Sequence, residues 1–189
     1  MLWDLAHQAL FSDHPYGRPV NGTRDSILNM GREQLVAFHN RWYVPNNIAV
    51  VIVGDVSESE AIAAAEKAFN GLIRGPVNTA RRKAYSPSPG SRQQVYYHRG
   101  PLAYVGLTVK APGMSSPLAV CATDVLQALL AEGRTSLLQP LVRGIKAPAV
   151  MAGAEFLTSR EPSPFLIWAG CTADKTQQVK EEIERQIST

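Results

Sequence analysis

The stretch "HPYGRPVNGT", residues 14–23, places two prolines and two glycines within ten residues, between two segments that have helical spacing of apolar residues. Pro15 ends the first segment because proline has no backbone N–H with which to continue a helix. Gly17 and Gly22 are expected to supply positive φ angles in a tight loop, and Pro15 and Pro19 to fix the directions in which the chain leaves it. By itself, this stretch predicts a structural loop and no chemistry.

The first part of the chain predicts three helices and one strand around this loop. Apolar spacing predicts the helices at residues 2–11 and 32–42, and a capping-box pattern of Ser57 and Glu60 opens a third that runs to residue 72. The uninterrupted β-branched run "IAVVIV", residues 48–53, predicts a strand that is buried on both faces.

Residues 73–94 form the best candidate for a linker. They contain several prolines and glycines, many basic side chains and no sustained hydrophobic period. The basic cluster at residues 81–83 is interpreted as part of a solvated linker rather than as a contact for an acidic partner. The predicted division is therefore residues 1–72, a linker at 73–94, and residues 95–189.

The second part predicts strands, helices and an antiparallel sheet. Ser116 is the expected N-cap of a strong apolar helix, and Asp174 the expected cap of the last one. The polar turn at residues 158–163 is short, so the strands that flank it must be antiparallel. The predicted class is α+β, with helices packed on one face of each sheet. The predicted elements are strands at 95–98, 102–111, 149–157 and 164–172, and helices at 117–130, 135–143 and 175–187.

Composition narrows the possible partners and compartments. The net charge of +3 and the pI near 9.0 fall short of what nucleic-acid binding would indicate. The longest uninterrupted apolar run has six residues, too few to cross a bilayer. The first residues lack the basic region and cleavage site of a signal peptide. Neither nucleic acid nor a membrane span is expected, and the bacterial cytoplasm and the periplasm both stay open.

The histidines do not form a metal-binding pattern. No two of them lie four residues apart on one helix. His7 could ligate a metal together with Asp4, but an ion pair or a solvated side chain on the helix surface is the better interpretation. His14 is expected to bond local backbone and His39 to be half-buried, while His98 stands beside an arginine. No residue of this chain is predicted to bind metal or to be catalytic.

Nucleotide and thiol chemistry are also disfavoured. The segment at residues 50–57 offers a single glycine where a phosphate cradle needs several, and Asp55 would repel a phosphate. Cys121 and Cys171 belong to no CxxC motif, and both are interpreted as buried free thiols.

The order of these segments resembles the M16 family of zinc peptidases, which includes pitrilysin, insulin-degrading enzymes and mitochondrial processing peptidase. In that family a His-Pro-x-Gly-x-Pro turn and a nearby glycine precede a helix that ends in Tyr-x-Pro-x-Asn, and a strand then ends in Gly-Asp. The matching residues here are His14, Pro15, Gly17, Pro19, Gly22, Tyr43, Pro45, Asn47, Gly54 and Asp55. The expected role of all ten is structural.

The second part resembles the start of the next M16 repeat more loosely. The segment at residues 129–156 follows the family's glycine-containing turn and its glycine-alanine strand. The family usually has an arginine where Leu137 stands and an alanine-tyrosine pair near residues 149–150, and Pro140 is unusual inside a helix. The resemblance implies two M16-like halves: the second half of a first repeat, and the first half of a second repeat.

The resemblance implies a zinc site outside this chain. The family holds zinc with a His-x-x-Glu-His motif and a later glutamate, and the glutamate of the motif activates the water. No His-x-x-Glu-His occurs in the 189 residues. The resemblance places these ligands ahead of the chain, which we expect to have been cut from a longer protein. Zinc is therefore expected in the parent protein, and this chain alone is predicted to be inactive.

Three interpretations stay open. The chain is a non-catalytic segment of a zinc metalloendopeptidase that acts on peptides or unfolded polypeptides, alone, as a homodimer or with a homologous subunit. Alternatively, it is a piece of an inactive M16-like partner subunit that serves assembly and the formation of a peptide chamber. The third interpretation, an unrelated α+β binding domain, is disfavoured by the ordered run of motifs.

Overall fold

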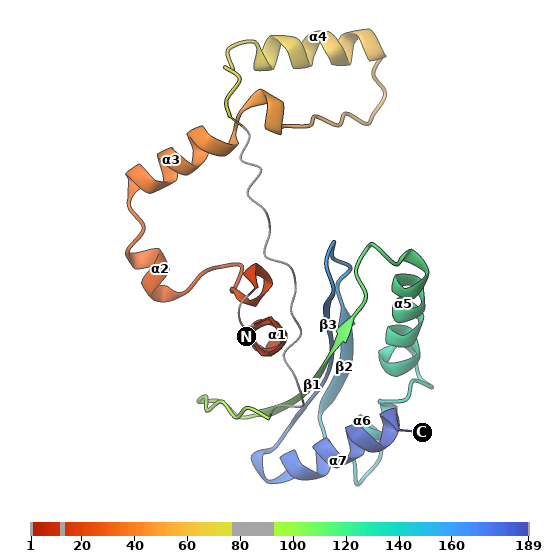
Figure 1. The fold of residues 1–189 in the computed structure, drawn as a ribbon. Coiled ribbons are helices and arrows are strands. Elements are labelled where there is room, and N and C mark those ends of the chain that lie inside the picture. Colours follow the sequence, from red (N-terminus) through yellow and green to blue (C-terminus); the bar gives the residue numbers. More distant parts are fainter. Residues whose placement is uncertain (1, 12–13, 77–92, 189) are drawn as a thin grey trace. The chain divides into compact units, whose positions relative to one another are not determined.

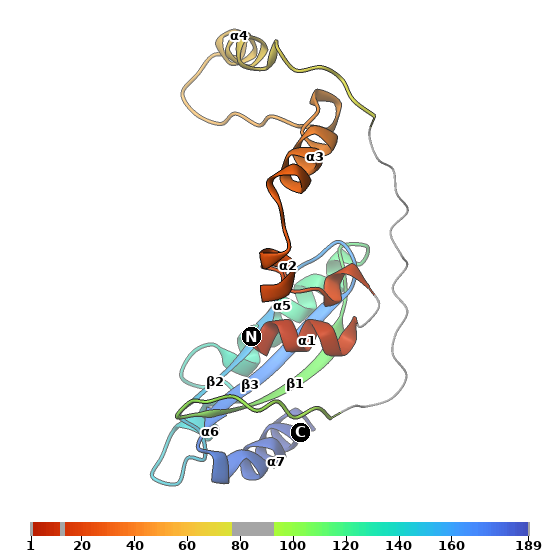
Figure 2. The same ribbon diagram turned by 90° about the vertical axis from the view of Figure 1, so that its left-hand side faces the viewer.

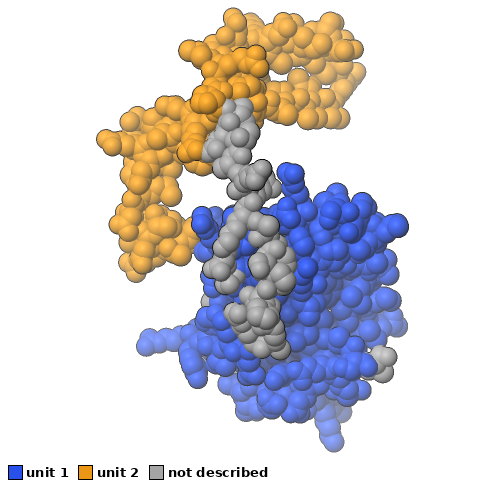
Figure 3. All heavy atoms as spheres, viewed as in Figure 1, with its two compact units in different colours: residues 1–20, 83–189 blue, residues 21–82 orange. Residues whose placement is uncertain are grey.

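The computed structural model describes residues 2–11, 14–76 and 93–188, which fall into two compact units (Figures 1 and 3). Unit 1 contains residues 1–20 and 83–189, and unit 2 contains residues 21–82. The predicted division placed residues 1–20 together with residues 21–72. The structure groups them instead with residues 83–189. Most of the predicted linker, residues 77–92, lies outside the described residues, and the assignment of the two parts to family repeats stays a prediction.

Unit 1 is built on a three-stranded antiparallel sheet. Its strands are β1 (Ala103–Ala111), β2 (Met151–Phe156) and β3 (Ser163–Cys171), in the order β1-β3-β2. In the register, β3 residue Trp168 stands opposite Gly106 of β1 and Gly153 of β2. The short polar turn forces β2 and β3 to run antiparallel, and the predicted α+β class with an antiparallel sheet is confirmed.

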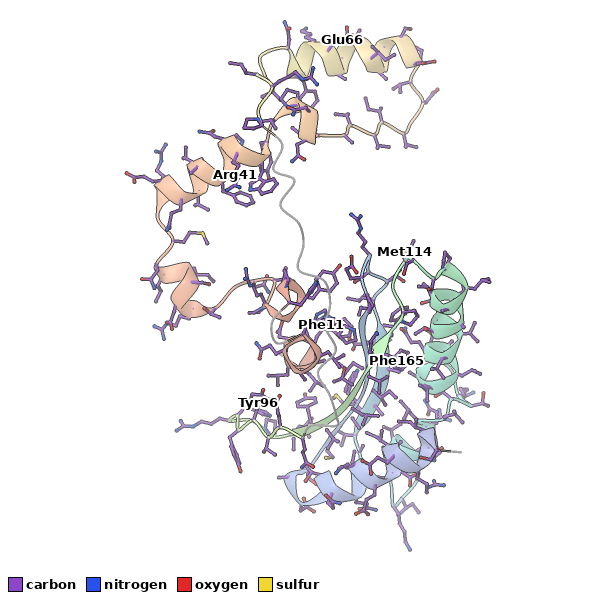
Figure 4. All side chains as sticks on the ribbon, in the orientation of Figure 1. Phe11, Arg41, Glu66, Tyr96, Met114 and Phe165 are labelled. Carbon is purple, nitrogen blue, oxygen red and sulfur yellow. The ribbon has the colours of Figure 1, made fainter. Side chains whose placement is uncertain are left out.

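The main hydrophobic core of unit 1 lies on one face of this sheet. Helices α5 (Pro117–Ala131), α6 (Gln139–Val142) and α7 (Thr176–Ile187) supply its other walls. Phe165 projects from β3 into this core (Figure 4). Burying each large apolar side chain here stabilises the fold by about 2 kcal/mol. The fully buried members include Leu141, Cys171, Val179 and Ile183.

Helix α1 (Leu2–Leu10) lies against the opposite face of the sheet, as Figure 2 shows. The approach is close because Gly106 has no side chain: a Cβ atom there would lie 3.2 Å from Cδ1 of Leu2. Both faces of the sheet are therefore in contact with helices. The prediction of helices on one face only does not hold for this sheet, since the sequence does not show on which face an isolated amphipathic helix packs.

Unit 2 contains only helices and irregular segments among its described residues. The helices are α2 (Arg24–Leu28), α3 (Arg32–Trp42) and α4 (Glu58–Phe69). The bounds of α3 agree with the prediction, and α4 opens with the predicted capping box of Ser57 and Glu60 but ends before residue 72. Helix α2 was not predicted; its capping box pairs Thr23 with Ser26, a less familiar residue at that position than Glu or Gln.

Two predicted strands are wrong. Residues 48–53 have no strand pairing, and Val51 and Val53 are 83% and 92% exposed instead of buried. Residues 95–98 are likewise exposed and unpaired, as the outward position of Tyr96 in Figure 4 illustrates. A strand needs a partner to satisfy its backbone groups, and neither segment has one among the residues that the structure describes.

Two smaller predictions need correction. Asp174 lies inside a 3-10 turn (η3, Ala173–Lys175) instead of capping α7, whose N-cap is Lys175. Hydrogen bonds from Thr172 and from its own backbone lower the pKa of the Asp174 carboxyl. Cys121 is exposed on α5, so only Cys171 is a buried thiol. Among the described helices, none is both long and apolar enough to cross a membrane.

Candidate functional site

The histidine-proline turn is the most strongly constrained of the predicted motifs. It forms a 3-10 turn, η1 (Pro15–Gly17), with His14 as its N-cap. The backbone N–H of Tyr16 donates to Nδ1 of His14 at 3.2 Å, and the N–H of Gly17 donates to the carbonyl oxygen of His14 at 2.9 Å. His14 is buried, and the prediction that it bonds local backbone is confirmed.

The two glycines of this stretch are required for different reasons. Gly22 has φ +71°, as predicted. Gly17 does not have a positive φ, so the predicted reason for it is wrong. A Cβ atom on Gly17 would instead overlap the backbone carbonyl of Phe11, the residue that follows α1. Gly17 therefore allows the turn to close onto the end of α1.

His7 connects α1 to the same turn. Its Nδ1 lies 2.9 Å from the carbonyl oxygen of Tyr16, and its ring contacts the rings of Trp3 and Phe11. Burial lowers the pKa of His7 more than this hydrogen bond and the nearby Asp4 raise it. The side chain is half-buried, so the predicted solvated side chain on the helix surface does not describe it. His7 acts as a structural link between helix and turn.

Lowering the pH is expected to destabilise unit 1 through His7. Because the pKa of His7 is lowered in the folded state, the unfolded chain binds the proton more readily, and stability is lost as the pH falls below about 6.5. The loss should stay below about 1 kcal/mol because solvent screens a half-exposed ring. Melting temperatures at pH 7.5 and 5.5 should fall further for the wild type than for His7→Gln. Equal falls in both proteins would contradict this role for His7.

The Tyr-x-Pro-x-Asn motif ends α3. Tyr43 is the C-cap of α3, and its ring stacks on His39, which is exposed rather than half-buried as predicted. Pro45 opens the 3-10 turn η2 (Pro45–Asn47), and the side-chain amide of Asn47 donates to the carbonyl oxygen of Trp42 at 2.9 Å.

Asn46 bonds a later segment of unit 2 rather than its own local backbone. Its side-chain amide instead donates to the carbonyl oxygen of Gly75 at 2.8 Å and accepts from the N–H of Gly75 at 3.2 Å. A Cβ atom on Gly75 would lie 2.6 Å from Cγ1 of Val44, which is buried. This pair of hydrogen bonds was missed because the asparagine and its partner lie 29 residues apart.

The remaining motif residues make few close contacts. A Cβ atom on Gly54 would meet nothing within 4 Å, and Asp55 is exposed. Pro19 is half-buried after the histidine turn. The structural roles assigned to Gly54, Asp55 and Pro19 stay predictions.

The described residues do not fit a zinc ion. No group of three or more His, Cys, Asp or Glu side chains that could hold a metal occurs among residues 2–11, 14–76 and 93–188. His7 and His14 each direct Nδ1 to the backbone of Tyr16. These two histidines therefore serve the packing of the turn.

Comparison with known proteins identifies the family. A family model described as "Peptidase M16 inactive domain" matches residues 29–189. The chain belongs to this family. The match covers unit 2 from α3 onwards and the whole sheet of unit 1.

The relatives of this M16 domain are much longer than the chain. An uncharacterized zinc protease of Mycobacterium leprae is 30% identical over 190 residues, which are 100% of the chain and 42% of the relative. The zinc protease PqqE of Helicobacter pylori is 31% identical over 188 residues, 97% of the chain and 42% of that protein. The chain thus spans about two fifths of the length of the curated relatives it matches.

Solved structures support the same fold. The crystal structure of a protease from Helicobacter pylori matches with a TM-score of 0.82 and 26% identity over 96% of the chain and 45% of that structure. A peptidase M16 inactive domain from Pseudomonas fluorescens matches with a TM-score of 0.83 over 98% of the chain and 44% of that structure. At 22% identity, the latter supports the fold alone.

Proposed function

We propose that the chain is a non-catalytic part of a zinc metalloendopeptidase, in which it supports the metal-binding half-domain and forms one wall of the peptide chamber. The observation that carries this proposal is the match of residues 29–189 to the M16 inactive domain. In the parent protein, zinc would activate the water that hydrolyses the peptide bond. The chain itself has no His-x-x-Glu-His motif and should not cleave peptides alone.

Exposed apolar surface supports a role within a larger assembly. The outer face of α5 carries exposed apolar side chains at helical spacing, among them Leu118, Val125 and Leu129. In unit 2, residues 48–53 expose a β-branched run with no partner strand among the described residues. Several exposed apolar side chains on one element are typical of faces that pack against further protein.

A second candidate is an inactive partner subunit of an M16-like assembly. The similarity to a protein named mitochondrial-processing peptidase subunit beta from Lentinula edodes, 27% identical over 124 residues, supports the assembly part of this candidate. In this case the same surfaces would serve assembly with a homologous subunit, and the protein would bind no zinc.

Metal content and peptide cleavage test both candidates. The native protein, purified from its source cells, is expected to contain about one zinc per chain and to lose cleavage of an unfolded polypeptide when a chelator removes the metal. The 189-residue chain, incubated with zinc and dialysed, should retain less than about 0.1 zinc ions per chain and should not cleave the unfolded polypeptide. A zinc-free native protein in a stable complex with a homologous subunit would favour the second candidate. Zinc-dependent cleavage by the chain alone would contradict both.

A further inference from the structure

The face of the sheet that α1 partly covers has an unusual side-chain pattern. Glycines stand directly beside large side chains in two neighbouring rows of the register. In one row Trp168 lies between Gly106 and Gly153, and in the next Gly170 lies between Tyr104 and Met151. A glycine weakens a strand, and it often marks a place where another group approaches the backbone closely.

The large side chains of this face pack closely over the neighbouring glycines. A Cβ atom on Gly153 would be 3.1 Å from three atoms of the Trp168 indole. A Cβ atom on Gly170 would be 2.9 Å from Cγ of Met151 and 3.3 Å from Cε1 of Tyr104. Large side chains that occupy the space above glycines lie along the sheet instead of standing upright on it. Tyr104 and Met151 remain 43% and 39% exposed, and Trp168 is half-buried.

An exposed carboxylate stands beside these rings. Glu155 of β2 lies on the same face, two residues along the strand from Gly153, and its Oε1 accepts a hydrogen bond from Nε1 of Trp168 at 3.0 Å. Among the described residues, nothing donates to the other oxygen of this carboxylate. The three rows from Leu166 to Gly170 contain no lysine or arginine. Within these three rows the carboxylate of Glu155 is the one charged group, although the whole chain is basic. From outside the sheet, the ring of His98 lies 6.2 Å from that of Tyr104.

We propose that Tyr104, Trp168 and Glu155 form a platform that binds an arginine or lysine side chain of an extended polypeptide. A cation is attracted to the face of an aromatic ring, most strongly that of tryptophan, and arginine stacks on such rings. The carboxylate, held in place by the indole N–H, adds a charge-assisted partner for the same cation. The platform rests on the proposed function in one respect, which is that its ligand is a polypeptide. It requires neither zinc nor cleavage.

The charge of Glu155 distinguishes this ligand from a neutral one. Flat aromatic rings over a sheet also fit a sugar ring, but a carboxylate with an unused oxygen favours a cation over a neutral oligosaccharide. The two ligand classes differ in their response to salt and to removal of the charge: binding of a cation weakens under both changes, and binding of a sugar under neither.

Nuclear magnetic resonance provides the test, because the chain has three tryptophans and each gives a separate indole N–H signal. The probe is an unstructured peptide with three arginines in a Gly-Ser background, titrated into the 189-residue chain. A matched peptide has glutamine in place of each arginine. The Trp168 signal, assigned with Trp168→Phe, should shift with the arginine peptide at high micromolar to millimolar concentration. The glutamine peptide should bind at least about fivefold more weakly.

Variants of the chain separate the platform from unspecific attraction. Glu155→Gln retains an acceptor for the Trp168 indole but removes the charge, and should weaken binding about threefold. Tyr104→Leu should weaken it by about two- to fivefold. Glu132→Gln, an equal charge change on an exposed residue at the end of α5, should have no effect.

Several outcomes would overturn the platform. They are equal shifts with the arginine and glutamine peptides, shifts that leave Trp168 unchanged, unaltered binding to folded Glu155→Gln, and a neutral oligosaccharide that shifts Trp168 as strongly as the arginine peptide. Because the titration needs no metal and no cleavage, it can fail while the native protein proves to be a zinc peptidase, and the reverse also holds.

Discussion

Replacing Gly17 with alanine is expected to lower the free energy of unfolding of unit 1 by about 3 kcal/mol. The new methyl group would overlap the carbonyl of Phe11, which is backbone and cannot rotate away as a flexible side chain would. Phe11 is itself almost fully buried, so the turn has to move away from α1 to make room. That movement also breaks the hydrogen bond between His7 and the carbonyl of Tyr16.

Urea denaturation followed by circular dichroism, with hydrogen exchange of the peptide that covers α1, measures this effect. Gly54→Ala is the matched control, because a Cβ atom there meets nothing within 4 Å, and it should change stability by less than about 0.5 kcal/mol. Equal stabilities of Gly17→Ala and the wild type would show that the turn does not pack against the end of α1 as described.

Replacing Leu141 with alanine is expected to cost about 3 kcal/mol, the sum of the lost burial and the cavity that is left. Leu141 belongs to α6 and is fully buried in the core between the sheet and its helices. Its carbonyl oxygen also accepts from the N–H of Ala149, which leads into β2, so collapse of the site would disturb the sheet.

Leu137→Ala is the control for Leu141→Ala. It removes the same atoms from the segment just before α6, but Leu137 is 45% exposed, so the loss should be under about 1 kcal/mol. Thermal or urea unfolding of the two variants side by side gives the comparison. Similar losses for both would contradict the burial of Leu141 in a closely packed core.

Elements with local signals were predicted well. Helix α3 has the predicted bounds, because apolar spacing opens it and Pro45 follows its end. Helix α4 opens at Ser57, where the capping box is a purely local arrangement of side chain and backbone. The antiparallel pairing of β2 with β3 follows from the short turn that joins them.

Elements that depend on distant partners were predicted poorly. Residues 48–53 have the composition of a buried strand, but composition does not provide a neighbouring strand with which to pair. The placement of α1 on the second face of the sheet depends on the missing side chain of Gly106, which is 104 residues from Leu2 along the chain. Neither fact can be derived from hydrophobic period alone.

The candidate site shows the same limit. The sequence identifies Gly17 as a required glycine, but the reason is the approach of Phe11, which the sequence does not show. The rows that bring Trp168 between two glycines depend on the register of three strands. Glycines inside the predicted strands were the available signal, since an interior glycine often marks close approach of another group.

The most direct test of the central claim is peptide mass mapping of the native polypeptide from its source cells. We expect residues upstream of Met1 that include a His-x-x-Glu-His motif and a later glutamate, which would place the zinc site in the same protein as this M16 inactive domain. A native polypeptide with an upstream half-domain in which those positions are replaced would identify an inactive partner subunit instead. A native polypeptide that begins at Met1 would contradict the assignment to a zinc peptidase.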